Sequence, residues 1–126
     1  MIFGIGVDLV KIPRIAAALE RFGDRFKNRL YTPLEISVCE ARGHSANCYA
    51  LRFAAKEAFS KALGVGLRKN GIRWREVEVV PNALGKPELQ VSGRAAELCA
   101  EAHITNMHLS LTDEGDYGAA VVVLER

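Results

Sequence analysis

The chain has 126 residues, of which 49% are hydrophobic and 25% are charged, and its formal net charge is +2. This is the composition of a folded domain, and it excludes an intrinsically disordered chain. No apolar run approaches the roughly 18 residues of a membrane span, so we expect one soluble domain over residues 1–126 and no contact with a membrane.

The cysteines Cys39, Cys48 and Cys99 are odd in number and form no C-x-x-C pair. This pattern predicts neither a disulfide framework nor a structural zinc site. It fits a protein of the reducing cytoplasm.

Residues 2–7 predict a short buried strand that stops at Asp8. One interpretation of this acid is an N-cap for a helix that begins near Lys11. The other is a carboxylate presented at the end of a strand, where oxygen ligands for a hard metal ion are often found.

A helix is predicted over about residues 11–22, with Pro13 in its first turn and a break at Gly23. Residues 11–29 hold six basic and two acidic side chains, and Arg14, Arg21 and Arg25 follow one helical edge. Such an edge is either a solvated face or a docking surface for an acidic partner.

Thr32, Pro33 and Glu35 form a capping-box pattern, which predicts a helix over about residues 33–42. The next and longest helix is expected to begin near Ser45, a good N-cap residue, and to end at Gly64. Its small apolar residues predict a stripe against which neighbouring backbone packs closely; they are Leu51, Ala54, Ala55, Ala58, Ala62 and Leu63.

The other edge of this helix carries Phe53, Glu57, Lys61 and Gly64. As an exposed i, i+4 pair, Glu57 and Lys61 stabilise the helix by only roughly 0.2–0.5 kcal/mol. Together with Asp8, however, they suit Mg²⁺ and a polyphosphate, because the metal takes carboxylate oxygens and the ammonium balances phosphate charge.

The segment 64–71 is rich in glycine and basic residues, and is either a flexible connection or a wall for a phosphate-bearing ligand. Beyond it, alternation predicts a strand over 73–80 with Trp74 in the core, a hairpin at 81–87 and a strand over 88–91. A helix over 93–102 capped by Ser92, and strands over 107–111 and 118–124, complete the chain; the run Val121–Val123 favours a strand covered on both faces. This order predicts an α+β fold in which helices pack on a largely antiparallel sheet.

Several stretches resemble the small 4′-phosphopantetheinyl transferases of the holo-acyl-carrier-protein synthase family. They are Gly6–Val10, Arg52–Ala58 and Lys61–Gly64, followed by Gly85–Pro87 and His108–Leu111. They occur in the family's order and cover nearly the whole chain.

The resemblance implies transfer of 4′-phosphopantetheine from coenzyme A to a serine of apo acyl carrier protein, which leaves adenosine 3′,5′-bisphosphate and supports fatty acid biosynthesis. It implies Mg²⁺, with Mn²⁺ as an alternative, held by Asp8 and Glu57. Glu57 is also the candidate general base, and Lys61 is expected to contact the phosphates and to stabilise the leaving group.

The same resemblance implies a homotrimer with active sites between subunits. Gly64, Arg52, Lys86 and His108 become candidates for the coenzyme A site, His108 from the neighbouring subunit, and Arg14, Arg21 and Arg25 become docking residues for the carrier. The chain departs from many relatives at Asp113, where they carry a second histidine; only a role in the turn is expected for it.

Two other functions compete. A non-catalytic module that binds coenzyme A or a nucleotide would need no Mg²⁺ and would release no product. A small nucleic-acid-binding domain would use the basic edge, but the edge lacks interleaved aromatics and the net charge is only +2. Neither accounts for Asp8, Glu57 and Lys61, so an enzyme is the expectation, without a nucleic-acid partner.

Overall fold

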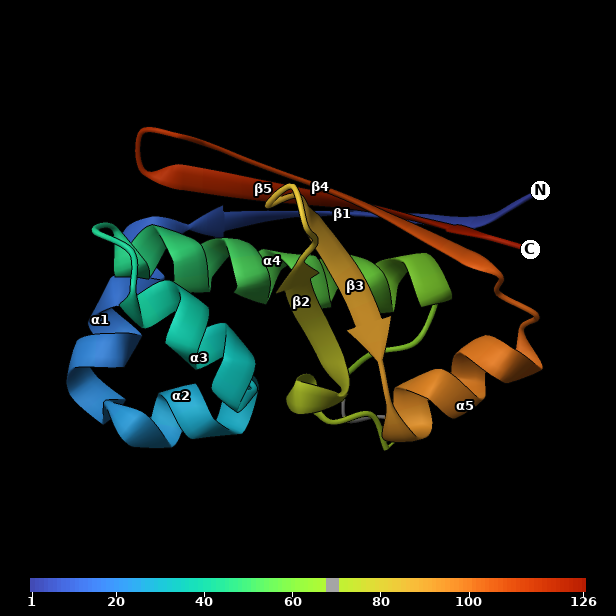
Figure 1. Ribbon diagram of the computed structural model, residues 1–126, viewed down its shortest axis with the longest axis horizontal. Helices are drawn as coiled ribbons and strands as arrows, with labels where there is room; N and C mark the ends of the chain where they lie inside the picture. The colour runs from blue at the N-terminus through green and yellow to red at the C-terminus, as the bar shows by residue number, and fades with distance from the viewer. Residues whose placement is uncertain (68–70) are drawn as a thin grey trace.

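The structure is a computed structural model that describes residues 1–67 and 71–126. Its central element is helix α4 (Ser45–Leu63), which lies along one face of a three-stranded antiparallel sheet (Figure 1). The sheet has the order β1 (Ile2–Lys11), β5 (Tyr117–Glu125) and β4 (Asn106–Glu114). The predicted α+β class with antiparallel pairing is confirmed.

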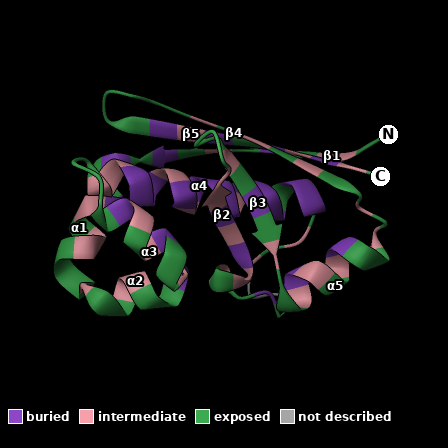
Figure 2. Cartoon of the chain, in the orientation of Figure 1, coloured by how far each residue is buried: buried purple, intermediate pink, exposed green. Residues whose placement is uncertain are grey.

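The remaining elements cover the other side of α4. Helices α1 (Ile12–Phe22), α2 (Asp24–Leu30) and α3 (Pro33–Glu40) gather at the end where α4 begins (Figure 1). The hairpin of β2 (Val77–Pro81) and β3 (Pro87–Val91) crosses the middle of α4, and α5 (Gly93–Glu101) follows it. Helix α4 is therefore enclosed between two layers, and most of its length is buried (Figure 2).

Glycines bring strand β1 into direct contact with α4. A Cβ at Gly4 would lie 1.9 Å from the Ala62 carbonyl oxygen, and one at Gly6 would lie 1.9 Å from that of Ala58. The predicted small-residue stripe is confirmed, except that Leu51 is only half-buried. Gly64 ends the helix at φ 88°, as predicted, whereas the N-cap is His44 and Ser45 is already helical.

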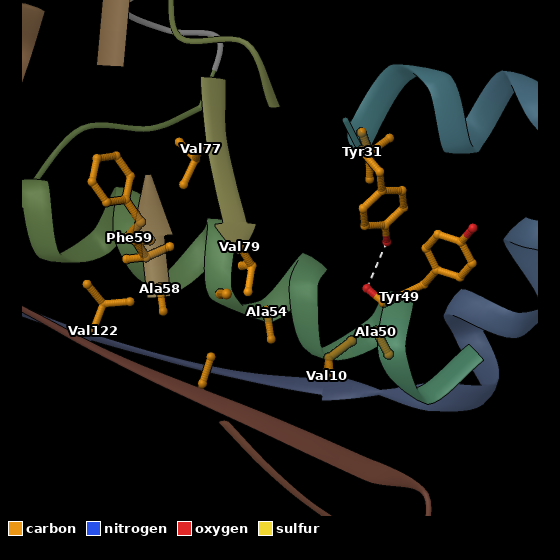
Figure 3. Close-up of a cluster of buried hydrophobic side chains, with 14 of the residues drawn as sticks. Val10, Tyr31, Tyr49, Ala50, Ala54, Ala58, Phe59, Val77, Val79 and Val122 are labelled. Carbon is orange, nitrogen blue, oxygen red and sulfur yellow. Dashed lines mark hydrogen bonds between the residues drawn. The ribbon is translucent and has the colours of Figure 1, made fainter. Parts of the chain in front are cut away.

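The core surrounds α4 on both sides (Figure 3). Ala54, Ala58 and Phe59 of α4 lie between Val122 of the sheet and Val79 of the hairpin, and all five side chains are fully buried. Near the start of α4, the Tyr31 hydroxyl donates a hydrogen bond of 2.8 Å to the Tyr49 carbonyl oxygen.

A buried ion pair joins α4 to α3, and its two side chains also hydrogen-bond to the backbone of η1 (Trp74–Glu76) and β2. Lys56 Nζ lies 2.8 Å from Glu35 Oε1, and both side chains are fully buried. The ammonium also donates to the Trp74 and Val77 carbonyl oxygens, and Glu35 Oε2 accepts from the Val79 N–H at 2.8 Å. Burial lowers the pKa of Lys56, while the Glu35 carboxylate acts in the opposite direction. Glu35 also completes the predicted capping box with Thr32.

The prediction for the first strand is wrong in two respects. Strand β1 does not stop at Asp8 but continues to Lys11, because its pairing with β5 extends through Asp8–Ala120 to Lys11–Tyr117. Asp8 therefore caps no helix. The strand is also covered on one face only, since Ile5, Val7 and Leu9 on the other face are between 59% and 67% exposed.

Three further elements differ from the prediction. Residues Trp74–Glu76 form a 3₁₀ turn, η1, because the Glu76 N–H bonds to the Arg73 carbonyl oxygen and its carboxylate accepts from the Arg73 N–H. Strand β4 includes residues 112–114, so the β4–β5 turn is shorter than expected. Strand β5 buries Ala120, Val122 and Leu124, whereas Val121 on its other face is exposed; one chain does not cover both faces.

The cysteine prediction is also corrected. Cys39 of α3 and Cys48 of α4 form a disulfide, with Cα atoms 5.4 Å apart. The two helices are joined by the short segment 41–44, and this places the cysteines together even though the sequence spacing does not show it. Cys99 is a buried free thiol. Within the two described ranges, no helix is both long and apolar enough to cross a membrane.

Candidate functional site

Strand β1 and helix α4 bring the three principal candidates together. Lys61 Nζ lies 3.1 Å from Asp8 Oδ1 and donates to the Val7 carbonyl oxygen at 3.1 Å. Glu57 is one helical turn before Lys61, and it shares a hollow of about 330 Å³ with Asp8. Asp8 points to the α4 side of the sheet because it alternates in phase with Gly4 and Gly6, which contact α4.

The two carboxylates repel each other. Burial raises the pKa of Glu57, the negative charge of Asp8 raises it further, and Lys61 partly offsets both effects. A cation between the two carboxylates would relieve this repulsion. No group of three or more His, Cys, Asp or Glu side chains suited to a metal occurs among the described residues. Two carboxylates fit Mg²⁺ nonetheless, because it commonly takes one or two from the protein and the rest from water and substrate phosphates.

A second hollow, of about 450 Å³, contains another candidate. Arg52 is only 3% exposed, donates to Cys48 Sγ at 3.1 Å, and lines this hollow beside Gly85, the neighbour of Lys86. The Arg52 Nε has no hydrogen-bond partner among the described residues. Burial lowers the pKa of Arg52. A buried guanidinium with spare donor capacity suits an anionic ligand.

Asp113 lines the same hollow and has a partner that the sequence did not reveal. Its carboxylate accepts a hydrogen bond of 3.0 Å from Asn47 in the first turn of α4. Asp113 therefore joins strand β4 to α4, and the expectation that it organises the β4–β5 turn is wrong.

His108 lies away from Asp8 and Glu57 within one chain. It pairs with Val123, which also pairs with Ile5, so His108 belongs to the uncovered face of the sheet. Its ring contacts the Glu125 carboxylate there. Asp8 is on the opposite face. Gly64 is exposed at the end of α4, one turn after Ser60, and residues 68–70 of the predicted phosphate wall lie outside the described residues.

The three predicted docking arginines are exposed on α1 and α2 but have different surroundings. Arg14 lines the hollow of Asp8 and Glu57. The Arg21 guanidinium lies 5.2 Å from the centre of the Phe22 ring. Arg25 lines a third hollow, of about 380 Å³, whose other walls include Phe53 and Trp74.

Trp74 lines the third hollow, and the sequence interpretation did not predict this. It was expected in the core, but it is only half-buried and its ring stacks on Phe53 with centroids 5.2 Å apart. Phe53 itself lies on the helix edge of Glu57, and it lines both the first and the third hollow. The position of Phe53 on the same helical edge as Glu57 is therefore the feature of the sequence that could have indicated an aromatic wall near the carboxylates.

Comparison with known proteins shows the family of the chain. Residues 4–122 match the model of the 4′-phosphopantetheinyl transferase superfamily. The chain is 50% identical to a holo-acyl-carrier-protein synthase of Geobacter sp. (strain M21), with 100% of both chains covered. It is 48% identical to that of Geobacter metallireducens, covering 100% of this chain and 99% of the other.

Solved structures give the same result. The crystal structure of holo-acyl-carrier-protein synthase from Neisseria meningitidis is similar with a TM-score of 0.90 and 41% identity, and both chains are covered completely. The Helicobacter pylori synthase in complex with coenzyme A is similar with a TM-score of 0.82 and 30% identity, covering 96% of this chain and 99% of that one. The chain therefore belongs to the 4′-phosphopantetheinyl transferase superfamily.

Proposed function

We infer that this protein is a holo-acyl-carrier-protein synthase, which transfers 4′-phosphopantetheine from coenzyme A to a serine of apo acyl carrier protein. The products are holo carrier protein and adenosine 3′,5′-bisphosphate, and the reaction supports fatty acid biosynthesis. The full-length similarity to synthases at 48–50% identity carries this conclusion. Asp8 and Glu57 line one hollow, and Lys61 contacts Asp8 beside it, which gives the conclusion a chemical basis.

In the proposed reaction, the serine hydroxyl oxygen attacks the pyrophosphate phosphorus that bears pantetheine. The bond from this phosphorus to the bridging oxygen breaks, and adenosine 3′,5′-bisphosphate leaves with the bonding electrons. Glu57 takes the serine proton as the general base. The Lys61 ammonium stabilises the charge on the leaving phosphate.

Asp8 and Glu57 would hold Mg²⁺, or Mn²⁺ in its place, against the pyrophosphate. When bound, the ion supplies positive charge to phosphate oxygens during phosphoryl transfer. The mutual repulsion of the two carboxylates supports this assignment.

Coenzyme A would occupy both the hollow of Asp8 and that of Arg52. Arg52, Lys86 and His108 supply positive or titratable groups for its phosphates, and Gly64 lets backbone approach them. In one chain, His108 and Asp8 are on opposite faces of the sheet, and this supports a site that is completed by the His108 of a second subunit.

We therefore propose a homotrimer assembled through the uncovered face of the three-stranded sheet. Ile5, Val7 and Leu9 of β1 and Val121 of β5 form an exposed apolar surface there, and His108 is on the same face. Apolar surface of this extent on a sheet is typical of an interface between subunits. We propose a cytoplasmic location on the similarity to the synthases alone, because the disulfide of Cys39 and Cys48 removes the argument from the cysteine pattern.

The test is intact-protein mass spectrometry of an apo acyl carrier protein incubated with this protein, coenzyme A and Mg²⁺, with a chelator control. We expect the carrier to gain the mass of one phosphopantetheine group, and chelation to prevent the gain. Binding of coenzyme A without any mass gain would instead support the non-catalytic module.

A further inference from the structure

A second group of arginines surrounds Trp74, apart from the basic edge that the sequence revealed. Arg29 at the end of α2 and Arg73 and Arg75 beside Trp74 line a fourth hollow, of about 700 Å³. All three arginines are exposed. None of them takes part in a salt bridge within the described parts of the chain.

The positive charge of this hollow is largely uncompensated. Among the described residues of its wall, Glu76 is the one acidic side chain, and its carboxylate already accepts a hydrogen bond from the Arg73 N–H. Exposed guanidinium groups without an internal partner remain available to a negatively charged ligand.

This hollow is connected to the reaction site through shared walls. Phe53 is common to the hollow of Asp8 and Glu57 and to the third hollow. Arg29 and Trp74 are common to the third and the fourth hollows. The Phe53–Trp74 stack therefore forms part of one surface that leads from the carboxylates across α2 to η1.

We propose that Arg29, Arg73 and Arg75 form, around Trp74, a second contact surface for the acidic carrier protein; this rests on the proposed function. A carrier that presents its serine at Asp8 and Glu57 while contacting the arginines of α1 and α2 extends along this surface. The combination of guanidinium groups and a half-buried tryptophan is typical of the residues that dominate protein interfaces. Charge complementarity identifies the occupant as the carrier and not as an apolar segment.

The direct test uses Trp74, which is the only tryptophan of the chain. Apo acyl carrier protein is titrated into the intact protein without coenzyme A, and tryptophan fluorescence is followed with a carrier that lacks tryptophan. We expect a saturable change whose midpoint rises about tenfold in R73Q/R75Q, with a strong dependence on salt. R126E is the matched control, because it lowers the net charge equally at the C-terminal end, away from η1 (Figure 1).

Kinetics separate this proposal from the proposed function. The KM for the carrier should rise in R73Q/R75Q, while the KM for coenzyme A and the rate at saturating carrier stay unchanged. If the wild type transfers the group and R73Q/R75Q has an unaltered KM for the carrier, the second contact surface is wrong but the proposed function stands. No transfer by the wild type would reject the proposed function, and the fluorescence titration would still report carrier binding. A short oligonucleotide that gives the fluorescence change when the carrier gives none would overturn the proposal in favour of nucleic acid.

Discussion

Lys61 and Asp8 are 53 residues apart in the chain, yet the Lys61 ammonium lies 3.1 Å from the Asp8 carboxylate. The contact joins α4 to β1 beside the hollow that Asp8 and Glu57 line. The close approach of the strand to the helix depends on Gly4 and Gly6, because there is no room for a side chain at either position. The packing of the fold thus positions the charges that the chemistry needs.

Glu57→Gln should reduce transfer by at least about 100-fold, because the amide is neither a general base nor an anionic metal ligand. The replacement is nearly isosteric, so circular dichroism should show an unchanged fold. Glu97→Gln, at an exposed carboxylate of α5, is the control and should retain activity. Wild-type transfer by Glu57→Gln would refute both roles of this residue.

The same substitution should raise stability at neutral pH in the absence of metal. The folded-state pKa of Glu57 lies above its ordinary value near 4.5, through burial and the charge of Asp8. Its contribution to stability is therefore fully present below pH 4.5 and is lost as the pH rises through the folded pKa. Thermal unfolding of both proteins in chelator should show Glu57→Gln unfolding at the higher temperature at pH 7, with the difference vanishing at pH 4. A difference that does not change with pH would contradict the shift.

Arg21→Glu should weaken carrier binding without affecting coenzyme A. Arg21 is exposed and outside the hollow of Asp8 and Glu57, whereas Arg14 lines that hollow, so a change at Arg14 would mix docking with chemistry. Loss of one exposed charge pair costs up to about 1 kcal/mol, which is a fivefold rise in the KM for the carrier. Steady-state kinetics with each substrate varied in turn decide the matter, and an equal rise for coenzyme A would argue against docking.

Val7→Asp should dissociate the proposed trimer. It places a charge on the uncovered sheet face, midway along the edge strand β1, where Val7 is 59% exposed in a single chain. Light scattering after size-exclusion chromatography should show a monomer with little activity. Leu34→Asp, at an exposed apolar residue of α3, should leave the oligomer intact. If the wild type is already a monomer, the interface is wrong.

Mixing two inactive variants tests whether the site is shared. If His108 serves the neighbouring subunit, Glu57→Gln and His108→Ala chains should each have low activity alone. After co-refolding, some interfaces combine an intact Glu57 with an intact His108 and regain activity. Mixtures no more active than the average of the two variants would place His108 outside the neighbour's site.

Lys56→Met should destabilise the protein by about 3–5 kcal/mol, because it leaves the Glu35 carboxylate buried without its cation. Adding Glu35→Gln should recover part of this loss, since the amide oxygen still accepts from the Val79 N–H. Urea denaturation at a fixed protein concentration measures both effects. Equal stability of Lys56→Met and wild type would show that the pair contributes little.

The sequence alone determined the features that depend on near neighbours in the chain. Thr32 and Glu35 predict the start of a helix, because a capping box is completed within one helical turn. Gly64 predicts the end of a helix, because glycine adopts the left-handed conformation of this position without strain. The same holds for the Glu57–Lys61 edge of α4, whose spacing is fixed by the helix itself.

Only the tertiary structure decided how distant segments meet. The pairing with β5 extended β1 past Asp8, and the packing of α3 on α4 joined Cys39 to Cys48 and buried Lys56 against Glu35. The tertiary structure also leaves one face of the sheet uncovered, although the valine run of β5 indicated that both faces of this strand are buried. The physical reason is that strand register and helix packing minimise the free energy of the whole chain, and the choice of partner depends on surfaces that are far apart in sequence.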